Sequence, residues 1–236
     1  MSLDYTVRES LKAKHVSLKM SITGDLEVIV PKGFDQKQIP DILRRKQRWI
    51  DRVTERMTTQ QTLAGADVAT ERPDQISLQA IAETWRITYQ PTAKSTLHIQ
   101  EAPKQQLILK GNTQDLDYCK HALQQWMVGK AHHHLAPWLQ QVSRDTKLAF
   151  QNISIRRQKT VWGSCSEGKN ISLNAKLLFL PSDMVRYVLV HELCHTIHLN
   201  HSRDFWALVS QHEPNYRQLD TGLRDARYLV PWWMER

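Results

Sequence analysis

The stretch that decides the fold runs from Ser182 to His201 and reads SDMVRYVLVHELCHTIHLNH. Its first half is almost wholly apolar, which predicts a buried helix over Ser182–Leu199. On that helix His191 and His195 would lie on one face, about 6 Å apart along the axis, so both imidazoles could reach one ion. Glu192 would border this face and contact a water at the ion without ligating it. The pattern H-E-x-x-H therefore predicts a metal site with an adjacent general base.

The position of a third ligand depends on where this helix ends, because catalytic zinc usually takes three protein ligands. A continuous helix would carry His201 about 9 Å beyond His195 and onto another face. The helix must therefore end between them, and Asn200, which tolerates the left-handed conformation of a helix end, closes the apolar run. Ser202 can then cap a following helix. This places His201 at the break, turned back toward the ion.

Two other side chains are alternatives for the third ligand. Glu213 would suit the combination of two histidines and one glutamate that some zinc hydrolases use. His198 shares the helix face of His191 but lies about 10 Å further along, so it could ligate only if the helix broke early. It also stands where the metzincin pattern has glycine. His201 is the first choice, Glu213 the second and His198 the third.

The composition is that of a soluble globular protein with a basic surface. The 236 residues are 41% hydrophobic and 24% charged, and the formal net charge is +8. No run approaches the ~20 apolar residues of a membrane span, so we expect no membrane partner and a cytoplasmic location. Three cysteines without paired spacing fit free thiols in a reducing compartment. Nothing in the sequence indicates an oligomeric state.

The pattern along the chain favours an α+β fold in two regions. Residues 1–112 are predicted to be strand-rich with one long helix and residues 113–236 to be a mainly helical metal-binding region, although both could form one continuous domain. The first region has predicted strands at His15–Ile22, Leu26–Val30, Trp85–Tyr89, Thr96–Gln100 and Leu107–Lys110, a hairpin turn at Thr23-Gly24-Asp25, a helix at Gln38–Met57 and a loop at Thr62–Asp74. The second has a helix from Asp115, strands at Ile153–Thr160 and Asn170–Asn174, and helices at Ser182–Leu199, Ser202–His212 and Asn215–Ala226.

Basic residues gather at two places in the sequence. Arg44-Arg45-Lys46, with Arg48, falls on the first predicted helix, where a solvated face is the simplest interpretation. Arg156-Arg157, with Lys159, falls on the predicted strand Ile153–Thr160. This strand alternates with a period of two, so its polar face, which includes Arg156, could look into a cleft. Such basic groups attract polyanions at long range.

Several motifs in combination resemble one known family, the YgjP-like metal-dependent hydrolases. The segments that carry the likeness are Arg157–Ser166, Ile171–Asn174, the His-Glu-Leu-Cys-His helix with Asn200-His201-Ser202, and Phe205-Trp206. Val16-Ser17-Leu18, Val30-Pro31-Lys32-Gly33 and Lys46–Ile50 are also similar to the family. The likeness spans most of the chain and is strongest from Arg156 to Trp206.

The resemblance implies a zincin-like metallopeptidase fold with His191, His195 and His201 as metal ligands and Glu192 as the catalytic residue. The expected metal is Zn²⁺, although other divalent ions can occupy such a set. The family is described both as metallopeptidases and, in bacteria, as UTP pyrophosphatases. A metal-bound water could attack either a carbonyl or a phosphoryl group, so the motif does not choose between these substrates.

Three functions follow, in order of preference. The first is a nucleoside triphosphate pyrophosphatase that converts UTP to UMP and pyrophosphate, with a metal-bound water activated by Glu192. The second is a zinc metallopeptidase in which a strand over Trp162–Cys165 pairs with an extended peptide. A basic nucleic-acid-binding protein with a structural metal fits less well, because structural zinc usually has four protein ligands and Glu192 would be idle. The expected substrate-binding residues are Arg156, Lys159, Trp162, Ser164 and Cys165.

Overall fold

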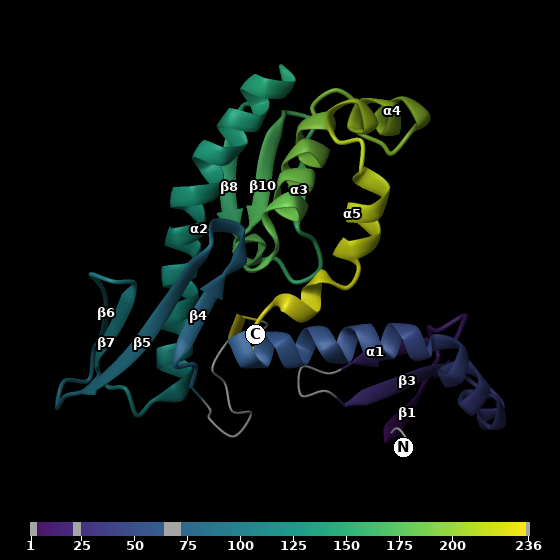
Figure 1. Ribbon diagram of the computed structural model, residues 1–236, viewed down its shortest axis with the longest axis horizontal. Helices are drawn as coiled ribbons and strands as arrows, with labels where there is room; N and C mark the ends of the chain where they lie inside the picture. The colour runs from purple at the N-terminus through teal and green to yellow at the C-terminus, as the bar shows by residue number, and fades with distance from the viewer. Residues whose placement is uncertain (1–3, 21–24, 64–71, 235–236) are drawn as a thin grey trace.

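The N-terminal part of the protein consists of a small sheet and one long helix (Figure 1). The computed structural model describes residues 4–20, 25–63 and 72–234. Its first elements are β1 (Tyr5–Ser10), β2 (Ser17–Met20), β3 (Leu26–Pro31), a 3-10 turn (Gln36–Gln38) and α1 (Ile39–Leu63). The strand order is β1-β3-β2, in which β1 runs parallel to β3 and β2 antiparallel to it. Alternate residues of β3 are buried against the apolar side of α1.

A second sheet follows, with a long helix beside it. It comprises β4 (Gln75–Leu78), β5 (Glu83–Pro91), β6 (Leu97–Ala102) and β7 (Gln106–Gly111), in the order β4-β5-β7-β6, with a 3-10 turn (Gln79–Ile81) after β4. Helix α2 (Leu116–Thr146) begins after Asp115, whose carboxylate accepts a hydrogen bond from the Tyr118 amide at 2.9 Å. This cap satisfies one of the free N–H groups of the first turn. Figure 1 shows α2 running along this sheet and on beside β8.

The third sheet and the C-terminal helices carry the histidines. Strands β8 (Asn152–Arg156), β9 (Gly163–Cys165) and β10 (Asn170–Asn174) lie in the order β8-β10-β9, with β9 antiparallel to β10 at one edge. A 3-10 segment (Ala175–Phe179) leads to α3 (Ser182–Cys194), α4 (Arg203–His212), α5 (Tyr216–Leu223) and two 3-10 turns (Ala226–Leu229 and Trp232–Met234). Helix α3 contacts β9, α2, α4 and α5, so it lies at the centre of this region.

The protein has two separate buried apolar cores, and along the chain the change from one to the other falls between α1 and β4. The smaller core holds residues of β3 and α1 together with Tyr228, and the larger extends from Ile76 to Met234. The second sheet therefore shares its core with the C-terminal helices. Trp49 of α1 connects the two parts: its ring packs edge-on against Tyr228 at 6.5 Å, and its indole N–H donates to Asp225 at 3.2 Å.

The structure is a mixed α and β fold with a strand-rich N-terminal region, as predicted. Strand β9 lies within the strand expected at Trp162–Cys165, whereas β1 and β4 are not among the predicted elements. β1 is exposed along most of its length and so has no apolar alternation, and β4 has only four residues. The predicted strand Ile153–Thr160 is too long, since β8 ends at Arg156. Helix α1 continues past Met57 to Leu63, and most of the loop predicted after it lies outside the described residues, as do Thr23 and Gly24.

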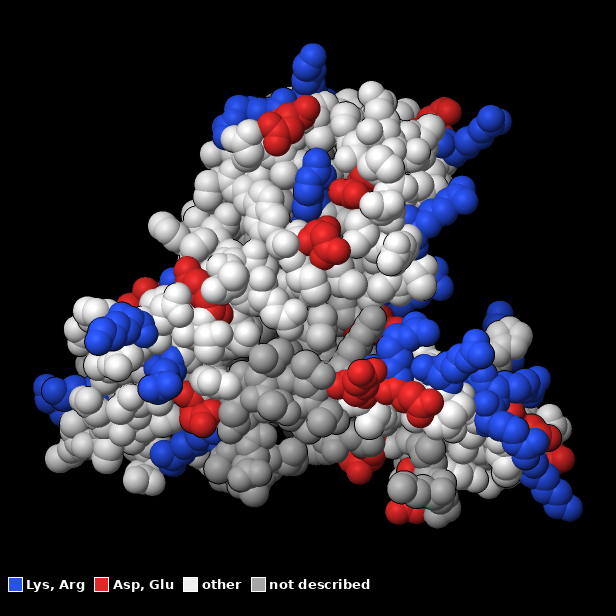
Figure 2. All heavy atoms as spheres, in the orientation of Figure 1, with Lys and Arg blue, Asp and Glu red and all other residues white. Residues whose placement is uncertain are grey.

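Many basic side chains are exposed at the α1 end of the molecule (Figure 2). Arg44, Arg45, Lys46 and Arg48 are all exposed, which agrees with the solvated face predicted for them. Within the part of the chain that the structure describes, no helix combines the length and the apolar character needed to cross a bilayer.

Candidate metal centre

Helix α3 ends at Cys194, well before the predicted end at Leu199. The Thr196 hydroxyl donates to the carbonyl of Leu193 at 2.7 Å, and the His198 amide donates to the carbonyl of Cys194 at 3.0 Å. These bonds satisfy carbonyls of the last turn while the chain leaves the helix axis. The predicted end is therefore wrong, because a hydroxyl and a tight turn end the helix before the apolar run closes.

The early turn returns His201 to the two histidines of α3. The Ser202 hydroxyl accepts a hydrogen bond from the Phe205 amide at 3.3 Å and caps α4, as predicted. Just before this cap, His201 Nε2 lies 3.1 Å from His191 Nε2, and His195 Nε2 lies 3.2 Å from the same atom. Three nitrogens that each bind one zinc ion at about 2.0–2.1 Å in tetrahedral geometry would be about 3.3 Å apart. One divalent ion therefore fits among the three rings.

Hydrogen bonds outside the cluster orient two of these rings. His195 Nδ1 donates to the carbonyl oxygen of His198 at 2.9 Å, which leaves the Nε2 lone pair facing the cluster. His191 Nδ1 lies 3.5 Å from the hydroxyl oxygen of Tyr187, and that hydroxyl donates to Asp220 at 3.1 Å. Outer partners of this kind fix the tautomer and the orientation of metal-binding histidines.

The histidines of α3 are held in the neutral form, which is the form that can bind a metal. Burial, followed by the neighbouring His195 and His201, lowers the pKa of His191 to about 3. Burial also lowers the pKa of His195, whose ring stacks on Phe205 with centroids 4.4 Å apart. Within the described residues, His191, His195 and His201 form the one group of side chains with metal-ligand spacing.

The two alternative third ligands have other roles in the structure. The Glu213 carboxylate forms an ion pair with Arg186 at 3.2 Å. His198 contributes its backbone carbonyl to His195 rather than its ring to the cluster. Neither side chain belongs to the group with metal-ligand spacing, whereas His201 does.

Glu192 lies beside the cluster at a point where the backbone of β9 approaches closely. Its residue is only 5% exposed, and burial raises its pKa to about 8. A Cβ atom at Gly163 would lie 2.7 Å from Glu192 Oε1 and 2.8 Å from Cγ, so the absence of a side chain there makes room for the carboxylate. Its Oε2 atom is buried without a hydrogen-bond partner among the described residues. Such an oxygen is suited to receive a proton from a water beside the metal.

A cleft of about 520 Å³ opens over the histidines and Glu192. One wall is the segment Thr160–Cys165, which includes the predicted residues Trp162, Ser164 and Cys165, and the other comes from α3 and α5. Arg156 and Lys159 are exposed and do not line the cleft, contrary to the prediction, because β8 ends at Arg156 and the chain leaves the sheet there.

Two residues whose roles the sequence did not reveal shape this cleft. Arg224, just after α5, is the arginine in its lining, and its guanidinium lies 3.7 Å from the Asp220 carboxylate. Asn174, at the end of β10, donates its side-chain amide to the carbonyls of Gln158 at 2.9 Å and Val161 at 2.8 Å. Asn174 therefore holds the loop that forms one wall. No local pattern marks Arg224, which reaches the cleft only through the packing of α5 on α3.

The cysteines do not add a nucleophile to the site. Burial raises the pKa of the Cys165 thiol, so this side chain lines the cleft as a neutral group at pH 7. Cys194 is fully buried in the larger core, as predicted from its position on the helix, and Cys119 is buried there too.

A comparison with protein families agrees with this geometry. Residues 14–226 match the family model described as YgjP-like, metallopeptidase domain, and this span includes the three histidines and Glu192. No curated protein and no solved structure gives a match. The family and the histidine cluster together support a metal-dependent hydrolase. With most of its length matched by that one model, the chain belongs to the YgjP-like family.

Proposed function

We propose that this hydrolase is a nucleoside triphosphate pyrophosphatase that cleaves UTP to UMP and pyrophosphate. The observation that carries the proposal is the presence of Arg224 in the same cleft as the three histidines and Glu192. An arginine at the rim is suited to phosphate, because its planar donors match phosphate oxygens. All of these residues lie in region 113–236, to which we assign catalysis.

His191, His195 and His201 would hold the metal, with Zn²⁺ as the first choice of ion. A divalent ion there supplies Lewis acidity and neutralises phosphate charge. Glu192 would accept the proton of a water that attacks the α-phosphorus. The bond from this phosphorus to the bridging oxygen then breaks, and pyrophosphate leaves with the bonding electron pair. Trp162 and Ser164 would position the nucleotide from the opposite wall.

The buried state of Glu192 supports its role as the proton acceptor. Burial raises the pKa of Glu192 to about 8 in the metal-free protein, and the charge of a divalent ion at the histidines would favour the ionised form that accepts a proton. Three cysteines that remain free thiols favour a reducing compartment, so we place the reaction in the cytoplasm.

Product analysis of the zinc-loaded protein with a panel of nucleoside triphosphates tests this proposal. We expect UMP and pyrophosphate from UTP, and a loss of more than about 100-fold in turnover for Glu192→Gln. Arg86→Gln, on the exposed side of β5, serves as a control that should retain full activity. Release of orthophosphate instead of pyrophosphate, or unchanged turnover in Glu192→Gln, would refute the assignment.

A zinc metallopeptidase is the second candidate, and the position of β9 favours it. β9 is an edge strand that lines the cleft beside α3, and its free edge could pair with an extended peptide. Incubation of the same protein with unstructured peptides distinguishes the two. Peptide cleavage that is lost in Glu192→Gln, without any nucleotide turnover, would replace the first proposal by this one.

A further inference from the structure

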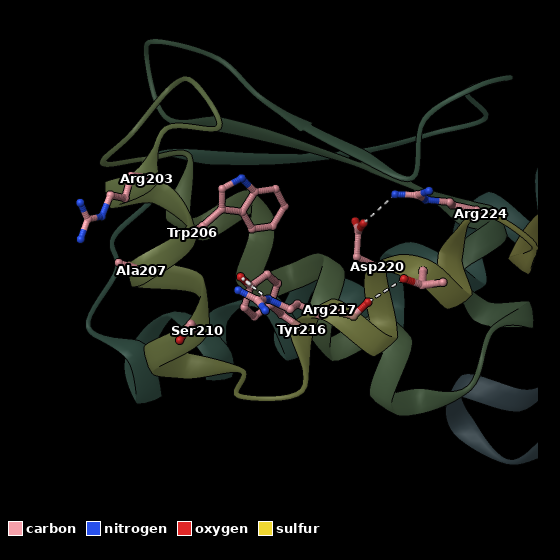
Figure 3. A pocket seen from close by; sticks show the side chains of 9 residues that line it. Arg203, Trp206, Ala207, Ser210, Tyr216, Arg217, Asp220 and Arg224 are labelled. Atoms are coloured by element: carbon pink, nitrogen blue, oxygen red, sulfur yellow. Dashed lines mark hydrogen bonds and ion pairs between the residues drawn. The ribbon is translucent and has the colours of Figure 1, made fainter.

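A second hollow, of about 640 Å³, lies between α4 and α5 next to the catalytic cleft (Figure 3). Its lining includes Arg203 and Trp206 of α4, Tyr216, Arg217 and Asp220 of α5, and Arg224 just after α5. Asp220 and Arg224 line both this hollow and the cleft over the histidines. The two spaces therefore adjoin, and a ligand could extend from one into the other past these two side chains.

The charge of this hollow is positive. Its lining contains Arg203, Arg217 and Arg224 but only one carboxylate, that of Asp220. Asp220 is already engaged, since it accepts a hydrogen bond from the Tyr187 hydroxyl at 3.1 Å and lies 3.7 Å from Arg224. The lining therefore has cationic groups in excess, and an anion is the ligand that would satisfy them.

Two of the arginines can turn their donors toward a ligand. Arg217 contacts the side chain of Tyr216, whose hydroxyl oxygen accepts a hydrogen bond from its Nε at 3.2 Å, and this leaves the terminal nitrogens for another partner. Arg203 lies at one end of the hollow in Figure 3 with its guanidinium directed away from the other labelled side chains, so it must change rotamer to contact a ligand there. Exposed arginines of this kind lose little hydration when they bind phosphate.

The aromatic residues of the hollow are engaged with one another. The Trp206 ring is stacked against His201, with centroids 5.5 Å apart, and against Tyr216, with centroids 5.3 Å apart. A nucleobase would have to displace one of these neighbours to stack on the indole. The hollow is therefore suited to recognise charge rather than a flat ring.

We propose that this hollow, lined by α4 and α5, is a binding subsite for the diphosphate part of the substrate, which becomes the leaving pyrophosphate. The inference rests on the proposed function, in which the α-phosphate lies at the histidines. The β- and γ-phosphates then extend past Asp220 and Arg224 toward Arg217 and Arg203. The nucleoside lies on the other side, along the wall that contains Trp162.

Isothermal titration calorimetry of the metal-free protein with inorganic pyrophosphate, at low salt, tests the subsite without any turnover. We expect wild-type protein to bind pyrophosphate and Arg217→Gln to bind it about threefold to tenfold more weakly. The double variant Arg203→Gln/Arg217→Gln should lose more, and Arg217→Lys should keep part of the affinity. Arg86→Gln has the same charge change outside the hollow and should bind like wild type. Binding should also weaken with added salt.

The outcomes separate the subsite from the proposed function. Absence of pyrophosphate binding to the wild-type protein, or equal affinity in wild type, Arg217→Gln and the double variant, overturns the subsite even if UTP is hydrolysed. Arginine-dependent binding of pyrophosphate together with no hydrolysis of any nucleotide supports the anion subsite and refutes the pyrophosphatase. If both proposals hold, Arg217→Gln should also raise the inhibition constant for pyrophosphate in UTP hydrolysis by the same factor.

Discussion

Replacement of Glu192 by glutamine should remove a pH dependence from the stability of the metal-free protein. The Glu192 residue is 5% exposed, and burial raises its pKa to about 8 from an ordinary value of 4.5. The folded protein therefore keeps this proton at pH values where the unfolded chain has lost it. The contribution of Glu192 to stability is complete below pH 4.5 and is lost as the pH rises toward 8.

The size of the effect follows from these two pKa values. Each pH unit between these two pKa values lowers the free energy of unfolding by nearly 1.36 kcal/mol. Through Glu192 alone, the free energy of unfolding should therefore fall by about 2.5 kcal/mol between pH 5 and pH 7. Glutamine has no proton to lose, so the variant lacks this term. The pKa of His191 is lowered to about 3, so its contribution to the free energy of unfolding rises with pH over an overlapping range. Wild type and Glu192→Gln both contain this histidine. The difference between them therefore isolates Glu192.

Urea unfolding of EDTA-treated protein at pH 5, 6, 7 and 8, followed by tryptophan fluorescence, measures this difference. The free energy of unfolding of Glu192→Gln, relative to that of wild type, should rise by about 2.5 kcal/mol between pH 5 and pH 7. Glu167→Gln, which removes an exposed carboxylate from the turn between β9 and β10, should follow wild type at every pH. If wild type and Glu192→Gln differ by the same amount at pH 5 and pH 7, Glu192 is ionised in the folded protein and the reasoning fails.

Three further predictions concern the geometry of the site. Gly163→Ala would place a methyl group 2.7 Å from Glu192 Oε1, so turnover should fall about 100-fold while the zinc content of the purified protein stays the same; normal turnover would show that the carboxylate can move freely. His201→Ala should weaken zinc binding, measured by competition with a chelator, by more than about 100-fold, whereas His198→Ala should change it little because His198 uses its backbone carbonyl. Tyr187→Phe removes the hydroxyl near His191 Nδ1 and should weaken zinc binding about 10-fold to 100-fold in the same assay, with the fold unchanged by circular dichroism.

The elements with local signals could be predicted from the sequence. Helix α3 begins at Ser182, and α4 is capped by Ser202, because apolar periodicity and a capping hydroxyl act over a few residues. The end of α3 could not be predicted in this way. It depends on the Thr196 hydroxyl turning back to the Leu193 carbonyl, a choice that hydrophobic periodicity does not show.

In the candidate site, too, some features follow from local sequence signals and others depend on how the elements pack. The spacing of His191 and His195 on one helix is a local property, and the return of His201 followed from the limited reach of a helix. Their assignment as metal ligands stays a prediction. Arg224 could not be identified, because an exposed arginine after a helix has no distinguishing pattern until α5 packs on α3. The closeness of Gly163 to Glu192 is likewise visible only once β9 lies against that helix.

The short segment from Asp220 to Asp225 connects the small N-terminal part of the protein to the histidine cluster. At one end Asp220 accepts the Tyr187 hydroxyl bond that leads to His191. At the other end Asp225 accepts the indole N–H of Trp49, and Arg52 of the same helix lies 4.0 Å from its carboxylate. Arg224, at the rim of the cleft, lies between Asp220 and Asp225 in the sequence. Through α1 and Asp225, the N-terminal sheet and helix are thus connected to the segment that carries Arg224, so we expect a displacement of α1 to change the rim of the cleft.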